Sequence, residues 1–144
     1  MRIDPSCAFC AIAVGRDRSV DIVCEEPLWL AFFPTAPATP GHTLVIPRAH
    51  IPDLWQADSV LGEALMRGAI RVGRAIGDAL APDGMNLITS AGSAAEQTVF
   101  HLHLHVVPRW RTDPIGPIWP PKERMTELLR AELADMIRKH CAVA

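Results

Sequence analysis

The chain has 144 residues, of which 49% are hydrophobic and 21% are charged, and its formal net charge at pH 7 is −2. This balance predicts a single globular domain that buries a core. The small net charge argues against a broad binding surface for nucleic acid or for an acidic membrane, and no apolar run approaches the ~18 residues that a membrane span needs. The apolar run at residues 8–14 lacks a convincing signal-peptide cleavage site, so we expect the protein in the cytoplasm.

The first half of the chain is predicted to form short strands followed by one long helix. Residues 7–14 are expected to form a short helix or a turn. The apolar runs "DIVCEE" and "LWLAFF", separated by a proline, predict two strands of an antiparallel pair. A loop in "PTAPATPGH" leads to a strand in "HTLVIP", which ends at Pro47. From Ser59 to about Leu80 apolar residues recur at helical spacing, with Asp58 or Ser59 as the N-cap.

The second half is predicted to add two strands and a second helix. "GMNLITSA" favours a strand, "GSAAEQ" a loop, and "FHLHLHVV" from Phe100 a strand that Pro108 closes. Residues 111–121 are rich in proline and glycine and are expected to be irregular. Pro121 suits the first turn of a C-terminal helix. One apolar stripe marks that helix: Met125, Leu128, Leu129, Leu133, Met136 and Ile137. The order of elements predicts an α+β domain with a mainly antiparallel sheet.

Three histidines alternate with apolar residues in the last predicted strand. Because successive side chains of a strand point to opposite faces, His101, His103 and His105 are expected to share one face while the leucines and valine between them face the core. A solvated polar face would be the ordinary explanation, but other polar residues would serve solvent equally well. Imidazole can ligate zinc, attack as a nucleophile or bind an anion, so a metal site and a phosphate site both stay open.

Further candidate ligands lie upstream. His42 and His50 flank the strand "HTLVIP", and Cys7 and Cys10 form a Cys-x-x-Cys pair near the start. That pair could be half of a metal site, a redox motif or a chance spacing, and redox chemistry ranks last because no strand precedes it. A structural zinc needs four ligands, commonly two cysteines and two histidines, which would leave three histidines for other work.

The sequence resembles the histidine triad (HIT) family, and within it the bacterial nucleotide-binding hydrolases. "HLHLHVV" fits the signature His-φ-His-φ-His-φ-φ, with φ apolar, and "PGHTLVIPRAHI" and "GSAAEQTVFHLHLHVVPR" resemble family segments in the usual order and spacing. The resemblance implies an α+β, HIT-like fold with a central, mainly antiparallel sheet flanked by helices, usually in a homodimer. We expect residues 1–110 to form the core and residues 111–144 a C-terminal extension, ending in an amphipathic helix, within the same single domain.

The resemblance also implies catalytic roles. His103 matches the nucleophile that attacks the α-phosphorus of a nucleotide and forms a covalent nucleotidyl-histidine. His105 matches a phosphate-contacting residue that protonates the leaving group, and His42 a residue that orients the nucleophile. The nucleotide contacts implied are apolar for the base and polar for the phosphates: Phe9, Ile12, Phe32 and Leu44, and Ser90, Gln97 and Thr98. From the residues alone, the apolar positions could equally be core, and the polar ones ordinary turn residues.

Some family members hold a structural zinc, and the resemblance carries its ligands to Cys7, Cys10, His50 and His101. Such a zinc would clamp the N-terminal arm to the sheet and would not activate water, because a site with four protein ligands has no open position. The alternative is that the two cysteines are small core residues. No organic cofactor is expected.

Two positions depart from the family pattern. Where the family often has Asn or Gln thirteen residues before the nucleophile, this chain has Ser90, which is shorter but still a hydroxyl donor. Where the family usually has Asp or Asn to hold the ribose hydroxyls, this chain has Pro34, which has neither a polar side chain nor a backbone N–H. We expect a nucleoside phosphoramidase-like hydrolase or transferase acting on phosphoramidate or phosphoanhydride bonds of a purine nucleotide or nucleotide conjugate. The alternatives are a dinucleoside polyphosphate hydrolase, a nucleotide-binding module with little turnover, and a hydrolase with a catalytic metal.

Overall fold

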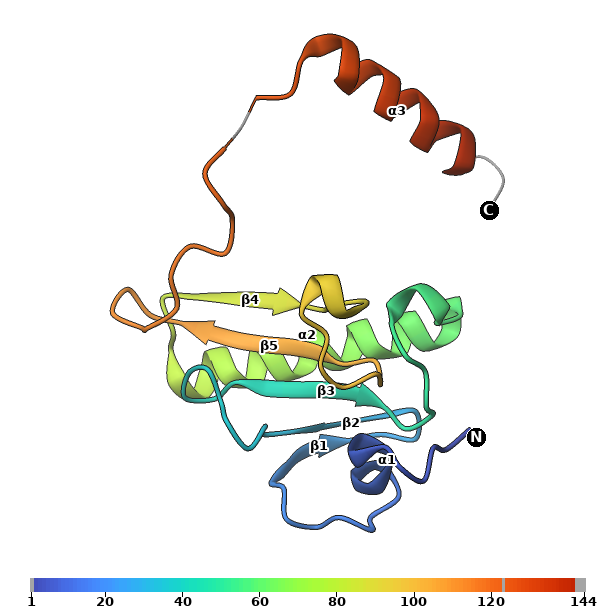
Figure 1. Cartoon of the computed structure of the whole chain (residues 1–144). Helices are drawn as coiled ribbons and strands as arrows, with labels where there is room; N and C mark the ends of the chain where they lie inside the picture. The colour runs from blue at the N-terminus through green and yellow to red at the C-terminus, as the bar shows by residue number, and fades with distance from the viewer. Residues whose placement is uncertain (1, 123, 142–144) are drawn as a thin grey trace. The chain divides into compact units, whose positions relative to one another are not determined.

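A five-stranded antiparallel sheet forms the centre of the protein (Figure 1). The computed structural model describes residues 2–122 and 124–141. The strand order is β1-β2-β3-β5-β4, so the long connection between the third and fourth strands carries the chain past β5 to the far edge. The strands are β1 (Ile22–Glu25), β2 (Trp29–Phe32), β3 (Thr43–Pro47), β4 (Gly84–Ile88) and β5 (Leu104–Arg109). The α+β class and the antiparallel sheet expected from the sequence are confirmed.

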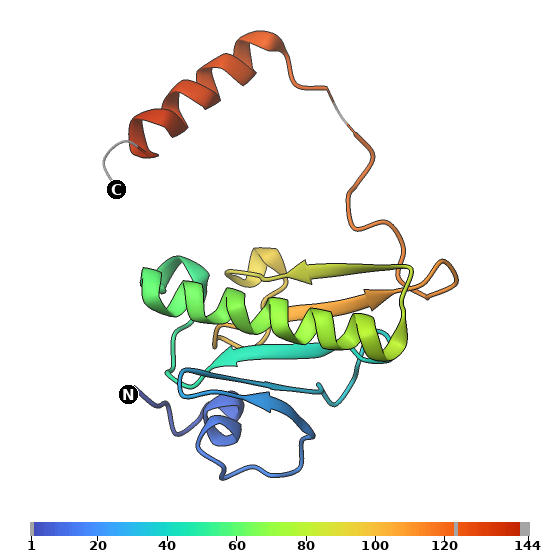
Figure 2. The same ribbon diagram turned by 180° about the vertical axis from the view of Figure 1, so that it is seen from behind.

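Helices cover both faces of the sheet. Figure 2 shows the long helix α2 lying across one face, and Figure 1 shows the short helix α1 on the other side, beside β1 and β2. The helices are α1 (Ala8–Ala13), α2 (Ser59–Leu80) and α3 (Glu127–Cys141), with 3-10 turns η1 (Leu54–Gln56) and η2 (Ser93–Ala95). The predicted cap of α2 is present, because the Asp58 carboxylate accepts the Leu61 N–H at 2.8 Å.

Each face of the sheet has its own apolar cluster. Alternate strand residues pack against α2 on one face: Trp29, Ala31, Val45, Leu104 and Val106. Their neighbours pack against α1 on the other: Leu30, Phe32, Leu44 and Ile46. The glycine at position 68 lets α2 approach the sheet closely, since a Cβ there would lie 2.8 Å from the Trp29 ring. No helix among the described residues is long and apolar enough to cross a membrane.

The histidine-rich strand starts later than the sequence predicts. β5 begins at Leu104, so His101 and His103 precede the hydrogen-bonded ladder. The opposing strand explains this, because Pro47 at the end of β3 has no N–H and its carbonyl accepts the His101 Nε2–H at 2.9 Å. The alternation itself persists, since Leu102 and Leu104 are buried against α2. β5 also runs on to Arg109, so Pro108 does not end it.

The chain divides into two compact units, residues 1–114 and 115–144. In the second unit the prediction for Pro121 is wrong, because α3 begins six residues later, at Glu127. The Thr126 hydroxyl accepts the Leu129 N–H at 3.3 Å and so caps the first turn instead. The apolar stripe of α3 is exposed: Leu128, Leu129, Leu133, Met136 and Ile137. That this extension belongs to the same domain as the sheet stays a prediction.

Candidate active site and metal centre

Two of the predicted catalytic histidines are joined by a direct hydrogen bond. His42 immediately precedes β3, and His105 lies on β5 opposite Leu44. The Ala38 N–H donates to His42 Nδ1 at 3.0 Å, so a neutral His42 carries its proton on Nε2. That Nε2–H donates to His105 Nδ1 at 2.9 Å. A neutral His105 therefore keeps its own proton on Nε2 and presents an N–H beyond the pair.

His103 is held in the opposite tautomer. Its Nδ1 lies 2.7 Å from the carbonyl oxygen of His101. Because a carbonyl oxygen can only accept, Nδ1 carries the proton and Nε2 keeps a free lone pair. The imidazole of His42 binds that of His105, so the role of His42 in orienting His103 stays a prediction. The two rings of His103 and His105 still touch, with centroids 4.8 Å apart.

Burial favours the neutral forms of His42 and His105. Burial lowers the pKa of His105 from 6.5 to about 4, and the neighbouring imidazoles of His103 and His42 lower it further. Burial also lowers the pKa of His42. An anion placed beside these rings would act in the opposite direction and favour their protonated forms.

The histidines open onto a cleft with a volume of about 360 Å³. His103 and His105 line it together with five residues that the sequence assigned to the nucleotide: Phe9, Ile12, Phe32, Leu44 and Thr98. The ring of Phe9 meets the ring of Phe32 edge-on at 5.5 Å and that of His103 at 5.4 Å. Pro34 also lines the cleft. The cleft thus combines apolar walls with a few polar groups at one place, as small-molecule sites commonly do.

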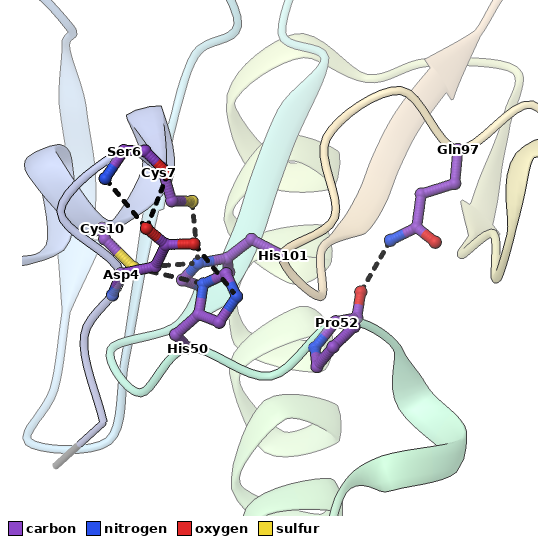
Figure 3. Close-up of polar contacts among 8 residues, drawn as sticks. All are labelled: Asp4, Ser6, Cys7, Cys10, His50, Pro52, Gln97 and His101. Carbon is purple, nitrogen blue, oxygen red and sulfur yellow. Dashed lines mark hydrogen bonds and ion pairs between the residues drawn. The ribbon is translucent and has the colours of Figure 1, made fainter.

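Two predicted nucleotide contacts are not among the residues that line the cleft. Gln97 is buried, and its Nε2 donates to the carbonyl of Pro52 at 2.6 Å (Figure 3). The same Nε2 donates to the carbonyl of Val99 at 3.1 Å, and Oε1 accepts the Gly92 N–H at 2.8 Å. This amide therefore fastens the loop that precedes the histidines. Ser90 is half-buried and lies at the start of that loop.

Sequence reasoning also missed several residues of the cleft. Short side chains and one carboxylate complete its wall: Ala8, Asp17, Ser19, Val20, Thr35, Ala36 and Val99. Four of them adjoin positions that the family resemblance pointed to: Ala8 and Val99 lie next to Phe9 and Thr98, and Thr35 and Ala36 follow Pro34. Residues 17–20 form an irregular segment, and no local pattern places them near histidines more than eighty positions away.

The predicted zinc ligands meet in one cluster (Figure 3). Cys7 and Cys10 come from the start of α1, His50 from the segment after β3, and His101 from the segment before β5. Their four ligand atoms all lie within 4.8 Å of one another. His101 Nδ1 is 3.5 Å from the sulfurs of both Cys7 and Cys10, and His50 Nδ1 is 3.4 Å from the Cys10 sulfur.

This geometry fits a zinc ion. With Zn–S of ≈ 2.3 Å and Zn–N of ≈ 2.0–2.1 Å, the nitrogen–sulfur edges of a zinc tetrahedron are about 3.5 Å long. The His101 Nε2–H donates to the Pro47 carbonyl, which leaves Nδ1 as the free lone pair. The Asp4 N–H lies 3.4 Å from the Cys10 sulfur, and the Asp4 carboxylate lies 3.9 Å from His50 Nε2. Burial raises the pKa of the Cys10 thiol, so a thiolate at this position needs a neighbouring cation to offset the desolvation.

Residues 16–112 match the HIT domain family. A HIT-like protein of Saccharolobus solfataricus is 37% identical over 123 residues, which cover 84% of this chain and 88% of the relative. The adenylylsulfatase HINT3 of Arabidopsis thaliana is 29% identical over 139 residues, which cover 93% of this chain and 68% of the relative.

Solved structures show the same fold. A crystal structure of a Streptococcus mutans protein has a TM-score of 0.88 at 32% identity and covers 96% of this chain and 87% of that one. A zinc-bound histidine triad protein from Mycobacterium smegmatis has a TM-score of 0.72 at 38% identity, with coverage of 93% and 97%.

Proposed function

The chain belongs to the HIT family, and we propose that it is a nucleotide hydrolase or transferase that attacks the α-phosphorus of a nucleotide with His103. The observation that carries this proposal is the tautomer of His103, whose Nδ1–H is held at 2.7 Å by the His101 carbonyl and whose Nε2 is left free in a ligand-sized cleft. An unprotonated nitrogen is what nucleophilic catalysis at phosphorus requires.

The proposed reaction has two steps with His105 as the proton carrier. A bound phosphate favours the protonated form of His105, which gives its Nε2 proton to the leaving group as His103 Nε2 bonds to the α-phosphorus. The phosphorus–leaving-group bond breaks in the same step. Neutral His105 then takes a proton from the water that attacks the nucleotidyl-histidine, which releases the nucleotide and restores His103. At rest the His42 Nε2–H holds the neutral His105 ring at 2.9 Å, and this bond gives way when His105 gains its second proton on Nδ1.

The substrate class follows from what the cleft can hold. Phe9, Ile12 and Phe32 offer apolar walls for a purine base, and Thr98 offers a hydroxyl. We infer a nucleoside phosphoramidate or a related nucleotide conjugate as the substrate. The name of the Arabidopsis relative, an adenylylsulfatase, supports a conjugate at the α-phosphate. Cleavage of dinucleoside polyphosphates needs the same chemistry and is the second candidate.

A nucleotide-binding module with little turnover is the competing function from another class. Pro34 supports it, because this residue lines the cleft and brings no hydrogen-bonding side chain for the ribose. The two functions differ in one observable, the covalent nucleotide on His103.

An assay panel tests the proposal. We expect the protein to release AMP from adenosine 5′-phosphoramidate, adenosine 5′-phosphosulfate or diadenosine tetraphosphate, and His103→Ala to lose at least about 10³-fold in kcat with an unchanged melting temperature. Intact-mass spectrometry after rapid acid quench should find an adenylyl adduct on the wild type alone. Wild-type turnover in His103→Ala would refute the mechanism, and tight AMP binding without turnover of any substrate would favour the binding module.

We further propose that Cys7, Cys10, His50 and His101 hold a structural zinc, which would tie α1 to the sheet. Metal analysis should find about one zinc per chain, lost in Cys7→Ser, and the variant should melt at a lower temperature. A metal-free wild type with unchanged thermal stability would contradict this. Since the ion has four protein ligands, chelators should act on stability, whereas a catalytic metal would make turnover depend on added ion. The homodimer and the cytoplasmic location stay predictions.

A further inference from the structure

The metal cluster and the cleft share one residue. The imidazole of His101 belongs to the cluster, with Nδ1 at 3.5 Å from two cysteine sulfurs. The backbone carbonyl of the same residue accepts the Nδ1–H of His103 at 2.7 Å. The residue whose side chain would ligate the ion therefore also fixes the tautomer of the proposed nucleophile.

A second link runs through Phe9. This residue lies on α1 between the two cysteines, and it lines the cleft. Its ring meets the rings of His101 and His103 edge-on, with centroids 5.9 and 5.4 Å apart. An ion held by the two cysteines would therefore fix α1 and, with it, the Phe9 ring that contacts His103.

We propose that the metal site and the nucleotide cleft are coupled through Phe9 and His101, so that each ligand binds more tightly when the other is present. This inference rests on both proposed functions above. A bound ion orders α1 and therefore the Phe9 ring. A nucleotide that packs on this ring then loses less conformational entropy on binding, because the ring is already ordered. Such a coupling is reciprocal, because the factor by which zinc tightens nucleotide binding must equal the factor by which the nucleotide tightens zinc binding. If the zinc served only to stabilise the fold, zinc would not change the affinity for the nucleotide, and the nucleotide would not change the affinity for zinc.

The test measures zinc release from the zinc-loaded full chain, so it needs no folded metal-free protein. The rate at which a chelator removes zinc is recorded without AMP and with saturating AMP, at chelator concentrations where the rate no longer depends on chelator. Calorimetry on the zinc-loaded protein measures AMP binding independently. We expect AMP to slow zinc release by about fivefold or more.

Two variants and a matched control locate the coupling. Phe9→Leu keeps all four ligands but removes the ring edges, so AMP should no longer slow zinc release. Phe9→Tyr restores the ring and should restore the effect. Ile12 lines the same cleft from α1 beyond both cysteines, so Ile12→Val should weaken AMP binding yet keep the slowing once AMP is saturating.

The outcomes distinguish a failure of the coupling from a failure of the proposed function. If AMP binds but zinc leaves at the same rate with and without it, the coupling is refuted and the proposed function stands. If Phe9→Leu keeps the full slowing, Phe9 is not the link. If AMP does not bind the zinc-loaded protein at all, the proposed function fails and the coupling fails with it.

Discussion

His103 and His105 stand two residues apart, yet their imidazoles are held in opposite tautomers. His103 donates from Nδ1 to a carbonyl, whereas His105 accepts at Nδ1 from His42. His103 therefore presents a lone pair, which attack on phosphorus needs, and His105 presents an N–H, which protonation of the leaving group needs. The alternating sequence predicts only that the side chains share a face. The hydrogen-bond partners of the two imidazoles depend on where the backbone enters the sheet and on the turn that places the Ala38 N–H beside His42.

The residue at position 34 offers a direct test of sugar recognition. Pro34→Asp would place a carboxylate in the wall of the cleft where the family usually has Asp or Asn. Because a charged hydrogen bond contributes about 1.5–3 kcal/mol, we expect AMP to bind roughly tenfold or more tightly, while 2′-deoxy-AMP gains less. Calorimetric titration of both nucleotides measures the difference.

The neighbouring residue is the matched control for this substitution. Thr35 also lines the cleft, so Thr35→Asp adds the same charge one position along the chain. It should weaken AMP binding through repulsion from the phosphate without separating the two sugars. Equal gains for AMP and 2′-deoxy-AMP in Pro34→Asp would contradict a ribose contact at this position.

The half-buried imidazole of His105 should make folding depend on pH. Its pKa is lowered to about 4 in the folded protein from 6.5 in the unfolded chain, so between these values the unfolded state binds more protons. Its contribution is present above about pH 6.5 and is lost as the pH falls toward 4. We expect the wild type to lose about 2 kcal/mol more of its unfolding free energy between pH 7 and pH 5 than His105→Gln. Urea titrations at both pH values measure this, and parallel losses in the two proteins would contradict it.

At the scale of elements, the apolar spacing predicts helix α2 from Ser59 to about Leu80, and the helix spans Ser59–Leu80. The start of β5 could not be predicted in this way, because it depends on Pro47 of a strand more than fifty positions away. The loop before β5 is a similar case. A glutamine in a small-residue loop gives no local sign that its amide is buried and joins three backbone groups.

Gln97 therefore has an expected role in stability. Gln97→Ala would leave the Gly92 N–H and the carbonyls of Pro52 and Val99 without their partner. Because buried groups left unpaired cost about 1–3 kcal/mol, we expect the free energy of unfolding to fall by about 2–3 kcal/mol. Chemical denaturation measures this change. A variant of normal stability that binds AMP poorly would show instead that Gln97 contacts the nucleotide.

At the scale of the whole molecule, the order of strands and helices predicts the α+β class, but not which strands are neighbours. β3 pairs with β5, and β4 is reached only after α2 has crossed the sheet. The metal cluster depends on the same topology, because it joins cysteines near the start of the chain to a histidine 94 positions later. Spacing alone could not predict that meeting, and the family resemblance supplied it.

The division of the chain after residue 114 leads to the last prediction. The residues of both apolar clusters lie within residues 9–106, so a chain ending at Pro114 keeps the packing of the sheet with α1 and α2. We expect its free energy of unfolding to lie within about 1 kcal/mol of that of the full chain, since every residue of the two apolar clusters is kept. Urea denaturation of both proteins measures the difference. A loss of several kcal/mol would show instead that the extension with α3 belongs to the same cooperative domain, as the sequence suggested.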